Sequence, residues 1–191
     1  MANKDIIISL PDAHLRRSST KVGLITDEIR QVIEDMKSST LDWEASRKHE
    51  VGVALAAIQI NRPLKIVIVR NDFDNKQDKS FSVFINPQIT KLEGEIEQDF
   101  EGCLSVADVY GKVPRHSKIR MRALDENGHE VRVRAEGFLA RVLQHEVDHC
   151  SGIMFIDHIK DNPKAFYSLT KDGKLENVDY GKVKNSHIFS D

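Results

Sequence analysis

A pair of histidines constrains the fold of this chain more than any other feature of its sequence. His145 and His149 flank Glu146 in the pattern His-Glu-x-x-His. Side chains four positions apart on an α-helix lie one above the other, so both imidazoles can bind one transition metal ion. Glu146 lies beside the first histidine, where a carboxylate can accept a proton from metal-bound water. The pattern predicts a helix that carries a metal site and its own base; the alternative is a surface helix with two histidines.

The residues before the motif predict that its histidines face the interior. Phe138 and Val142 precede His145 and His149 at the spacing of one helix face. The histidines therefore share a face with the apolar residues that anchor the helix. Ser151-Gly152 is expected to end it.

The first half of the chain predicts one helix and several strands. Thr26 to about Ser38 combines a capping residue, two acids and an apolar stripe, which is typical of a helix that covers a sheet. Leu64 to Val69 and Phe81 to Ile85 have the composition of buried strands. Asn86-Pro87 is expected to end the second of these strands.

Two further segments predict a β-hairpin. Ile119 to Leu124 and Val131 to Arg134 alternate apolar and basic residues, and Asp125 to Gly128 supplies a turn between them. One face of such a hairpin is exposed. We interpret its arginines as ordinary exposed residues and not as a nucleic-acid surface.

The order of these elements predicts an α+β fold. We expect mixed or antiparallel, short-stranded sheets around a central HExxH metal-binding helix, with an N-terminal covering helix. Residues 1–160 are expected to form a single catalytic domain. Residues 161–191 form a C-terminal extension whose packing the sequence leaves open. Within it, Leu169 to Leu175 has the pattern of a small hairpin.

Charge and hydrophobicity exclude some classes of partner. The 28 basic and 30 acidic side chains give a formal net charge of −2, which provides no electrostatic basis for binding nucleic acid or an anionic membrane. No apolar stretch has the length of a signal peptide core or a membrane span. We therefore expect a cytoplasmic protein with no membrane partner and no direct nucleic-acid site.

A cysteine is the best candidate for a third metal ligand. The chain has two, Cys103 and Cys150, and neither belongs to a Cys-x-x-Cys pair. A disulfide between them is not expected in a reducing cytosol. Cys103 follows Gly102 in a segment typical of a strand edge or turn, and a thiolate would favour Fe(II), Ni(II), Co(II) or Zn(II). The residues alone leave open whether Cys103 is a ligand or a buried cysteine.

Three segments together resemble the signature motifs of the peptide deformylase family. They are Gly-Val-Ala-Leu-Ala-Ala-Ile-Gln at 52–59, Glu-Gly-Cys-Leu-Ser at 101–105 and Gln-His-Glu-Val-Asp-His at 144–149. They occur in the family's order, and the similarity extends from about residue 5 to 160. The resemblance implies removal of the formyl group from the initiator methionine of new polypeptides, near the ribosome.

The resemblance also implies a metal site and a base. Cys103, His145 and His149 match the family's metal ligands, and Glu146 matches its catalytic acid and base. The family uses one divalent ion, commonly Fe(II), and also works with nickel, cobalt or zinc.

Further roles follow from the same resemblance. The side chain of Gln59 and the backbone N–H of Leu104 match the donors to the formyl oxygen. Gly52, Val53 and Ala54 match the segment that pairs with the substrate backbone. Apart from the resemblance, we expect Asp148, which points off the ligand face, to support the site from outside the ligand set or to be structural, and Arg141 to be a salt-bridge or rim residue.

Three positions depart from the family's usual pattern. Ala54 replaces a glycine, Ile58 replaces a proline, and Cys150 replaces a leucine. An added methyl at Ala54 is expected to narrow the substrate groove, and the loss of proline frees the turn that aims Gln59. Two alternatives therefore stay open: an amidase acting on another N-acyl substrate or a peptide bond, and a catalytically impaired homologue that binds metal and binds nascent chains or a partner.

Overall fold

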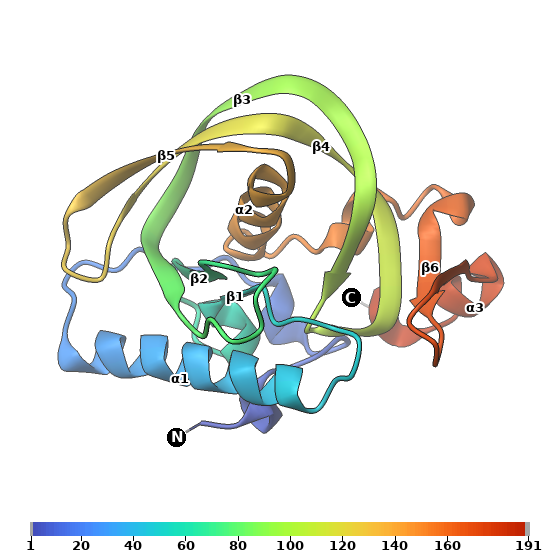
Figure 1. Cartoon of the computed structure of the whole chain (residues 1–191), viewed down its shortest axis with the longest axis horizontal. Coiled ribbons are helices and arrows are strands. Elements are labelled where there is room, and N and C mark those ends of the chain that lie inside the picture. Colours follow the sequence, from blue (N-terminus) through green and yellow to red (C-terminus); the bar gives the residue numbers. More distant parts are fainter. Residues whose placement is uncertain (1, 190–191) are drawn as a thin grey trace.

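The computed structural model describes residues 2–189, in which one antiparallel sheet wraps around a central helix (Figure 1). The α+β prediction is confirmed. The strands are paired in the order β1-β2-β3-β4-β6-β7, and β5 also pairs with β4, from Lys118 to Leu124. The helices and strands are α1 Asp27–Ala45, β1 Ala54–Ala56, β2 Ile66–Arg70, β3 Phe81–Cys103, β4 Val106–Leu124, β5 Glu130–Glu136, α2 Gly137–His149, β6 Phe166–Leu169, β7 Leu175–Asn177 and α3 Tyr180–Lys184.

Helix α1 begins where the sequence predicts and continues further. Thr26 caps it by accepting a hydrogen bond from Ile29 N at 3.4 Å. The polar residues after Ser38 do not end the helix, because Ser39 and Thr40 are buried and donate their hydroxyls to the carbonyl oxygen of Met36 at 3.1 and 2.8 Å. The apolar face of α1 packs in a core that includes residues of β1 and β2.

Strands β3 and β4 correct two expectations. Asn86-Pro87 does not end β3, because the pairing with β4 shifts register between Ile85 and Gln88 and accommodates both residues. Proline is tolerated at such a bulge, where no N–H is needed. The strands are also not short: β3 has 23 residues and β4 has 19, since repeated register shifts bend the pair into a continuous arch (Figure 1).

The predicted hairpin of residues 119–134 is confirmed. Strand β5 pairs with β4 from Leu124 opposite Glu130 to Lys118 opposite Glu136. Two arginines of the outer face bond to neighbours on the adjacent strand: Arg120 contacts Glu93 at 2.7 Å and Arg122 contacts Gln88 at 2.7 Å.

Helix α2 lies inside the arch of β3, β4 and β5, so its histidine face is enclosed (Figure 1). His149 is fully buried and His145 is 8% exposed. Ala140 and Leu143 of the same helix pack in a core with Val67 and Val69 of β2.

The C-terminal residues join the same sheet. The predicted hairpin at Leu169 to Leu175 is confirmed, because these two residues are partners at the end of the β6–β7 ladder. Phe166 and Val183 are buried in a core with Phe155. Ser190 and Asp191 lie outside the described residues. No helix of the described chain is long and apolar enough to cross a membrane.

Candidate metal centre and cleft

Cys103 lies at the tip of the longest hairpin in the described chain. Strand β3 ends at Cys103, Leu104-Ser105 forms the turn, and β4 begins at Val106. The N-terminal segment holds this turn in place, because Leu10 N donates to Ser105 O at 2.9 Å. The predicted strand edge around Cys103 is therefore observed.

Three electron-pair donors converge between this tip and helix α2. The Nε2 atom of His149 lies 3.4 Å from Cys103 Sγ and 3.2 Å from His145 Nε2, and the three ligand atoms all lie within 4.8 Å of one another. One sulfur and two imidazole nitrogens are the donors that zinc and borderline transition metals prefer. The residues present therefore fit a divalent transition metal ion.

The surroundings of His145 and His149 favour a positive charge on only one of the two imidazole rings. Burial lowers the pKa of His145, but Cys103 and Glu101 outweigh it and hold that pKa well above its usual range. Burial, with the charge of His145, holds the pKa of His149 well below its usual range. Two protonated imidazoles in contact would repel each other, so the contact between the rings disfavours a proton charge on both.

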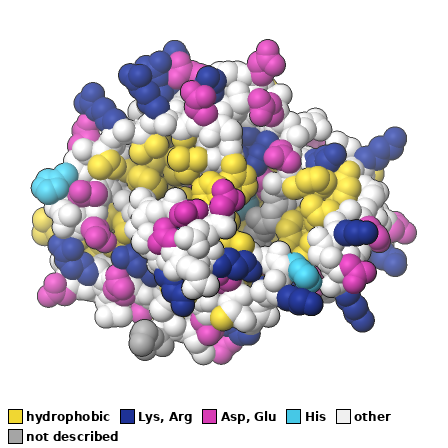
Figure 2. Space-filling view, viewed as in Figure 1, with side chains coloured by type: hydrophobic (Ala, Val, Ile, Leu, Met, Phe, Trp, Pro, Cys, Tyr) yellow, Lys and Arg dark blue, Asp and Glu magenta, His cyan; other side chains and the backbone are white. Residues whose placement is uncertain are grey.

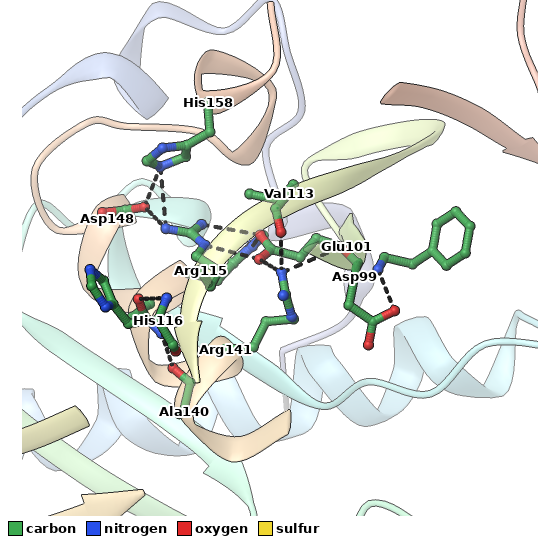
Figure 3. A network of polar contacts seen from close by, with 12 residues as sticks. Asp99, Glu101, Val113, Arg115, His116, Ala140, Arg141, Asp148 and His158 are labelled. Atoms are coloured by element: carbon green, nitrogen blue, oxygen red, sulfur yellow. Dashed lines mark hydrogen bonds and ion pairs between the residues drawn. The ribbon is translucent and has the colours of Figure 1, made fainter. Parts of the chain in front are cut away.

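Glu101 orients the first histidine of the motif. Its Oε2 lies 2.9 Å from His145 Nδ1, which leaves Nε2 of that ring to face the other donors. Arg115 donates to both carboxylate oxygens of Glu101 at 2.9 and 3.1 Å, and Arg141 donates to one at 2.9 Å (Figure 3). Burial alone would raise the pKa of Glu101, but His145 and Arg115 outweigh it and hold that pKa far below its usual range.

The role of Glu101 did not emerge from the sequence, although it lies in a signature motif. The signal was present: Glu101 and Cys103 are two residues apart on a strand and therefore project to the same side. The roles of Arg115 and Arg141 depend on Glu101 and on other partners that are distant in the sequence. The sequence alone therefore could not assign these contacts.

Asp148 and Arg141 lie outside the ligand set, as expected. Asp148 Oδ2 lies 2.5 Å from Arg115 Nη1 and 2.7 Å from His158 Nε2 (Figure 3). Arg141 is buried and donates to Val113 O at 2.7 Å as well as to Glu101. Both side chains thus brace the residues around Glu101.

Glu146 faces the cleft as a carboxylate without a partner. It is 4% exposed, and its Oε2 has no hydrogen-bond partner among the described residues. Burial, with a smaller contribution from Glu101, raises the pKa of Glu146 to about 7. A carboxylate with such a pKa can both accept and return a proton near neutral pH.

The amide of Gln59 is held in one orientation. Ala56 N donates to its Oε1 at 2.8 Å, so the Nε2 group faces Ser105 Oγ at 3.1 Å and Cys103 Sγ at 3.5 Å. This contact closes the 3₁₀ turn Ala57–Ile60, which has Ile58 where the resemblance leads us to expect proline. The side-chain oxygen of Gln59 therefore stabilises the same turn that orients its amide group.

The other departures from the family pattern lie in the core beside the site. Ala54, Ile58 and Cys150 are all buried in one apolar cluster. Burial raises the pKa of Cys150 to about 12, so this thiol stays protonated and acts in packing.

A cleft of about 370 Å³ opens over the donors. Cys103, Leu104, Glu146 and Gln59 line its inner part, and Val53 and Ala54 line one wall. Figure 2 shows hydrophobic side chains gathered in groups on this face of the molecule, with charged side chains of both signs around them.

Gly52 does not line this cleft, in contrast to Val53 and Ala54. Its N–H donates to Glu44 Oε2 at 2.9 Å, and Glu44 in turn pairs with the buried Arg70. A side chain at Gly52 would lie 2.6 Å from Thr40 Cγ2. Gly52 thus allows α1 to approach the segment before β1.

The sequence of this chain is similar to those of known deformylases. The sequence model of the polypeptide deformylase family matches residues 4–165. A peptide deformylase of Psychrobacter cryohalolentis is 42% identical over 154 residues, covering 80% of this chain and 78% of the relative. One from Rhodopseudomonas palustris strain TIE-1 is 39% identical, covering 86% and 90%.

Solved structures agree with the sequence relatives. The crystal structure of a peptide deformylase from Legionella pneumophila has a TM-score of 0.72 at 34% identity, covering 83% of this chain and 86% of that one. That of a Synechococcus elongatus peptide deformylase in complex with actinonin has a TM-score of 0.71 at 34% identity, covering 80% and 76%.

Proposed function

This chain belongs to the peptide deformylase family, and on that premise we propose that its cleft removes the formyl group from the initiator methionine of newly made polypeptides. The observation that carries the proposal is the convergence of Cys103, His145 and His149 beside the unpartnered carboxylate of Glu146. The place of action would be the cytoplasm, near the ribosome, where such polypeptides are made.

The proposed cofactor is one divalent metal ion held by Cys103 Sγ and the Nε2 atoms of both histidines. The mixture of thiolate and imidazole suits Fe(II), which we propose as the native ion, and also Ni(II), Co(II) or Zn(II). When bound, the ion would lower the pKa of a water molecule and polarise the formyl carbonyl.

Glu146 is the proposed acid and base. Its Oε2 is free to accept the proton of the attacking water, and its pKa of about 7, set by burial, suits both directions of transfer. The same carboxyl group would then deliver the proton to the departing amine nitrogen, so that formate and a free amino terminus result.

Gln59 and Leu104 are the proposed donors to the formyl oxygen. The hydrogen bond from Ala56 N fixes the amide of Gln59 with its N–H group toward the site. Leu104 lies in the turn next to Cys103, where its backbone N–H is close to the donors. Each well-aimed donor of this kind contributes about 2–4 kcal/mol to stabilisation of the transition state.

The wall formed by Val53 and Ala54 is the proposed place for the substrate backbone. Strand β1 is an edge strand of the described sheet and pairs with β2 on one side only. An extended peptide can add to such an edge by main-chain hydrogen bonds. Gly52 would support this wall from behind through its contact with Glu44.

Release of a free amine from formyl-Met-Ala-Ser tests the proposal. The protein is purified without oxygen and loaded with Fe(II) or Ni(II), and its metal content is measured first. We expect turnover of the formyl peptide and none of acetyl-Met-Ala-Ser. A fully loaded protein that releases no amine from the formyl peptide would overturn the proposed function, and preference for the acetyl peptide would support the alternative N-acyl amidase.

A further inference from the structure

The β6–β7 hairpin, which we name the C-terminal hairpin (residues 166–177), is firmly attached to the wall of the cleft. Strand β6 pairs with β4 at Tyr110 and Gly111. Phe166 is fully buried, and the ring of Tyr167 contacts that of Phe100 edge to face with centroids 4.9 Å apart. Phe100 itself lines the cleft. The hairpin is thus an integral part of the fold beside the site.

Two leucines of this hairpin face the cleft. Leu169 and Leu175 are directly opposite each other in the β6–β7 ladder, so their side chains share one face. Both are half-buried, and both line the cleft. Ser168 and Glu176, one position away in each strand, alternate to the other face.

The tip of the hairpin reaches the opposite wall. A Cβ at Gly173 would lie 3.1 Å from the His49 ring, so the backbone of the turn contacts the segment between α1 and β1. Gly173 has φ +78°, which permits this close approach. The hairpin therefore bounds the cleft on one side instead of leaving it open.

The charged groups at this end of the cleft bind one another. Arg47 lies 3.4 Å from Glu50 and 3.6 Å from Asp108, and the hydroxyl of Tyr110 donates to Glu50 at 2.5 Å. Leu169 and Leu175 line the cleft beside these paired charges and offer apolar side chains for recognition.

We propose that the C-terminal hairpin selects apolar side chains among the residues that follow the formylated methionine. The inference rests on the proposed function, which places the formyl group at Cys103 and His145. The rest of the peptide must then leave the donors along the cleft, and Leu169 and Leu175 line the cleft outside the ligand set. The hairpin follows residue 165, where the match to the family model ends, so this wall is not part of the matched domain.

The first test compares peptides that differ after methionine. We expect formyl-Met-Leu-Leu to exceed formyl-Met-Ser-Ser in kcat/KM by about 10-fold or more, as for apolar groups that gain a pocket. Replacing both leucines (Leu169→Ala with Leu175→Ala) should abolish this ratio through a higher KM for the leucine peptide. The kcat for formyl-Met-Ser-Ser should stay within about twofold, because neither leucine contacts the donors.

A second variant separates selection from damage to the fold. Leu175→Lys should invert the preference, so that formyl-Met-Glu-Glu becomes better than formyl-Met-Leu-Leu. Glu176→Lys is the matched control, since it changes the net charge more but lies on the other face of β7 and should leave the ratios unchanged. Misfolding cannot produce an inverted preference.

The outcomes of the two proposals are distinguishable. If the wild-type protein turns over all peptides equally, or the double variant keeps the leucine preference, the hairpin has no role in selection while deformylation stands. If the metal-loaded wild-type protein releases no amine from any peptide, the proposed function fails and the inference fails with it.

Discussion

The carboxylate of Glu101 lies 2.9 Å from Nδ1 of His145, and two buried arginines hold it there. With a metal ion bound, a carboxylate at Nδ1 would hold the proton on that nitrogen and leave Nε2 to face Cys103 and His149. One of the three proposed metal ligands, His145, is thus oriented by a residue that is not in the proposed ligand set.

Removing the charge of Glu101 is expected to weaken metal binding. Glu101→Gln should lower the affinity for Ni(II) by about 10- to 100-fold, because the amide no longer favours the required tautomer of His145. Competition with a chelator measures the change. Glu95→Gln, on the exposed part of the same strand, is the control, and equal affinities of the two variants would contradict the assignment.

The two cysteines are expected to differ in their effect on metal content. Cys103→Ala should lose stoichiometric metal, because it removes one of three converging donors. Cys150→Ala should keep it, since that thiol is buried in the apolar core. Metal analysis after gel filtration measures both, and an empty site in the Cys150 variant would show that the ligand set is wrong.

Loss of the Glu146 carboxylate is expected to affect catalysis and not metal binding. Glu146→Gln should lower kcat for formyl-Met-Ala-Ser by about 10²- to 10⁴-fold, the usual contribution of a general base. The metal content should equal that of the wild type. Glu130→Gln, on the exposed hairpin, serves as the control, and wild-type turnover by the Glu146 variant would rule out the proposed mechanism.

The Glu44–Arg70 pair is expected to make stability depend on pH. Burial alone would raise the pKa of Glu44, but hydrogen bonds from Arg70 and Gly52 outweigh it and hold the pKa below its ordinary value of 4.5. Because the folded pKa is lowered, the pair stabilises the fold above pH 4.5, and this contribution is lost as the pH falls through the folded pKa.

Urea unfolding of Glu44→Gln tests this pair. Near neutral pH the variant should lose about 3 kcal/mol of unfolding free energy, since it leaves the guanidinium of Arg70 buried without its carboxylate. The difference from the wild type should shrink as the pH is lowered below 4.5, where the wild-type carboxyl group becomes protonated. A difference that stays constant with pH would contradict the ion pair.

A methyl group at Gly52 is expected to push apart α1 and the segment before β1. The new Cβ of Gly52→Ala would meet Thr40 Cγ2 at 2.6 Å and the Thr40 carbonyl oxygen at 2.9 Å. Overpacking of this kind costs about 1–3 kcal/mol. Gly23→Ala, where no atom lies within 4 Å of the added Cβ, is the control in thermal unfolding. Equal melting temperatures of the two variants would contradict the contact.

The local elements of this protein were predictable because they depend on neighbours in the sequence. The start of α1 at Thr26, the β4–β5 hairpin and the helix of His145 and His149 each follow from capping, alternation or helical spacing over a few residues. Whether each of these segments forms a helix or a hairpin can therefore be predicted from nearby residues alone.

The curvature of the sheet was not predictable in this way. Proline at position 87 normally ends a strand, yet β3 passes through it because pairing with β4 continues on both sides of a bulge. Only the partner strand determines whether such a residue ends a strand or bends it.

The sequence by itself therefore determined that His145, Glu146 and His149, two of the proposed metal donors and the proposed base, lie together on one helix. The tertiary structure alone decided what surrounds them. Glu101 meets His145 across 44 residues of chain, and Leu169 and Leu175 reach the cleft through the pairing of β6 with β4. Such contacts depend on the register of distant strands, which no local pattern of residues specifies.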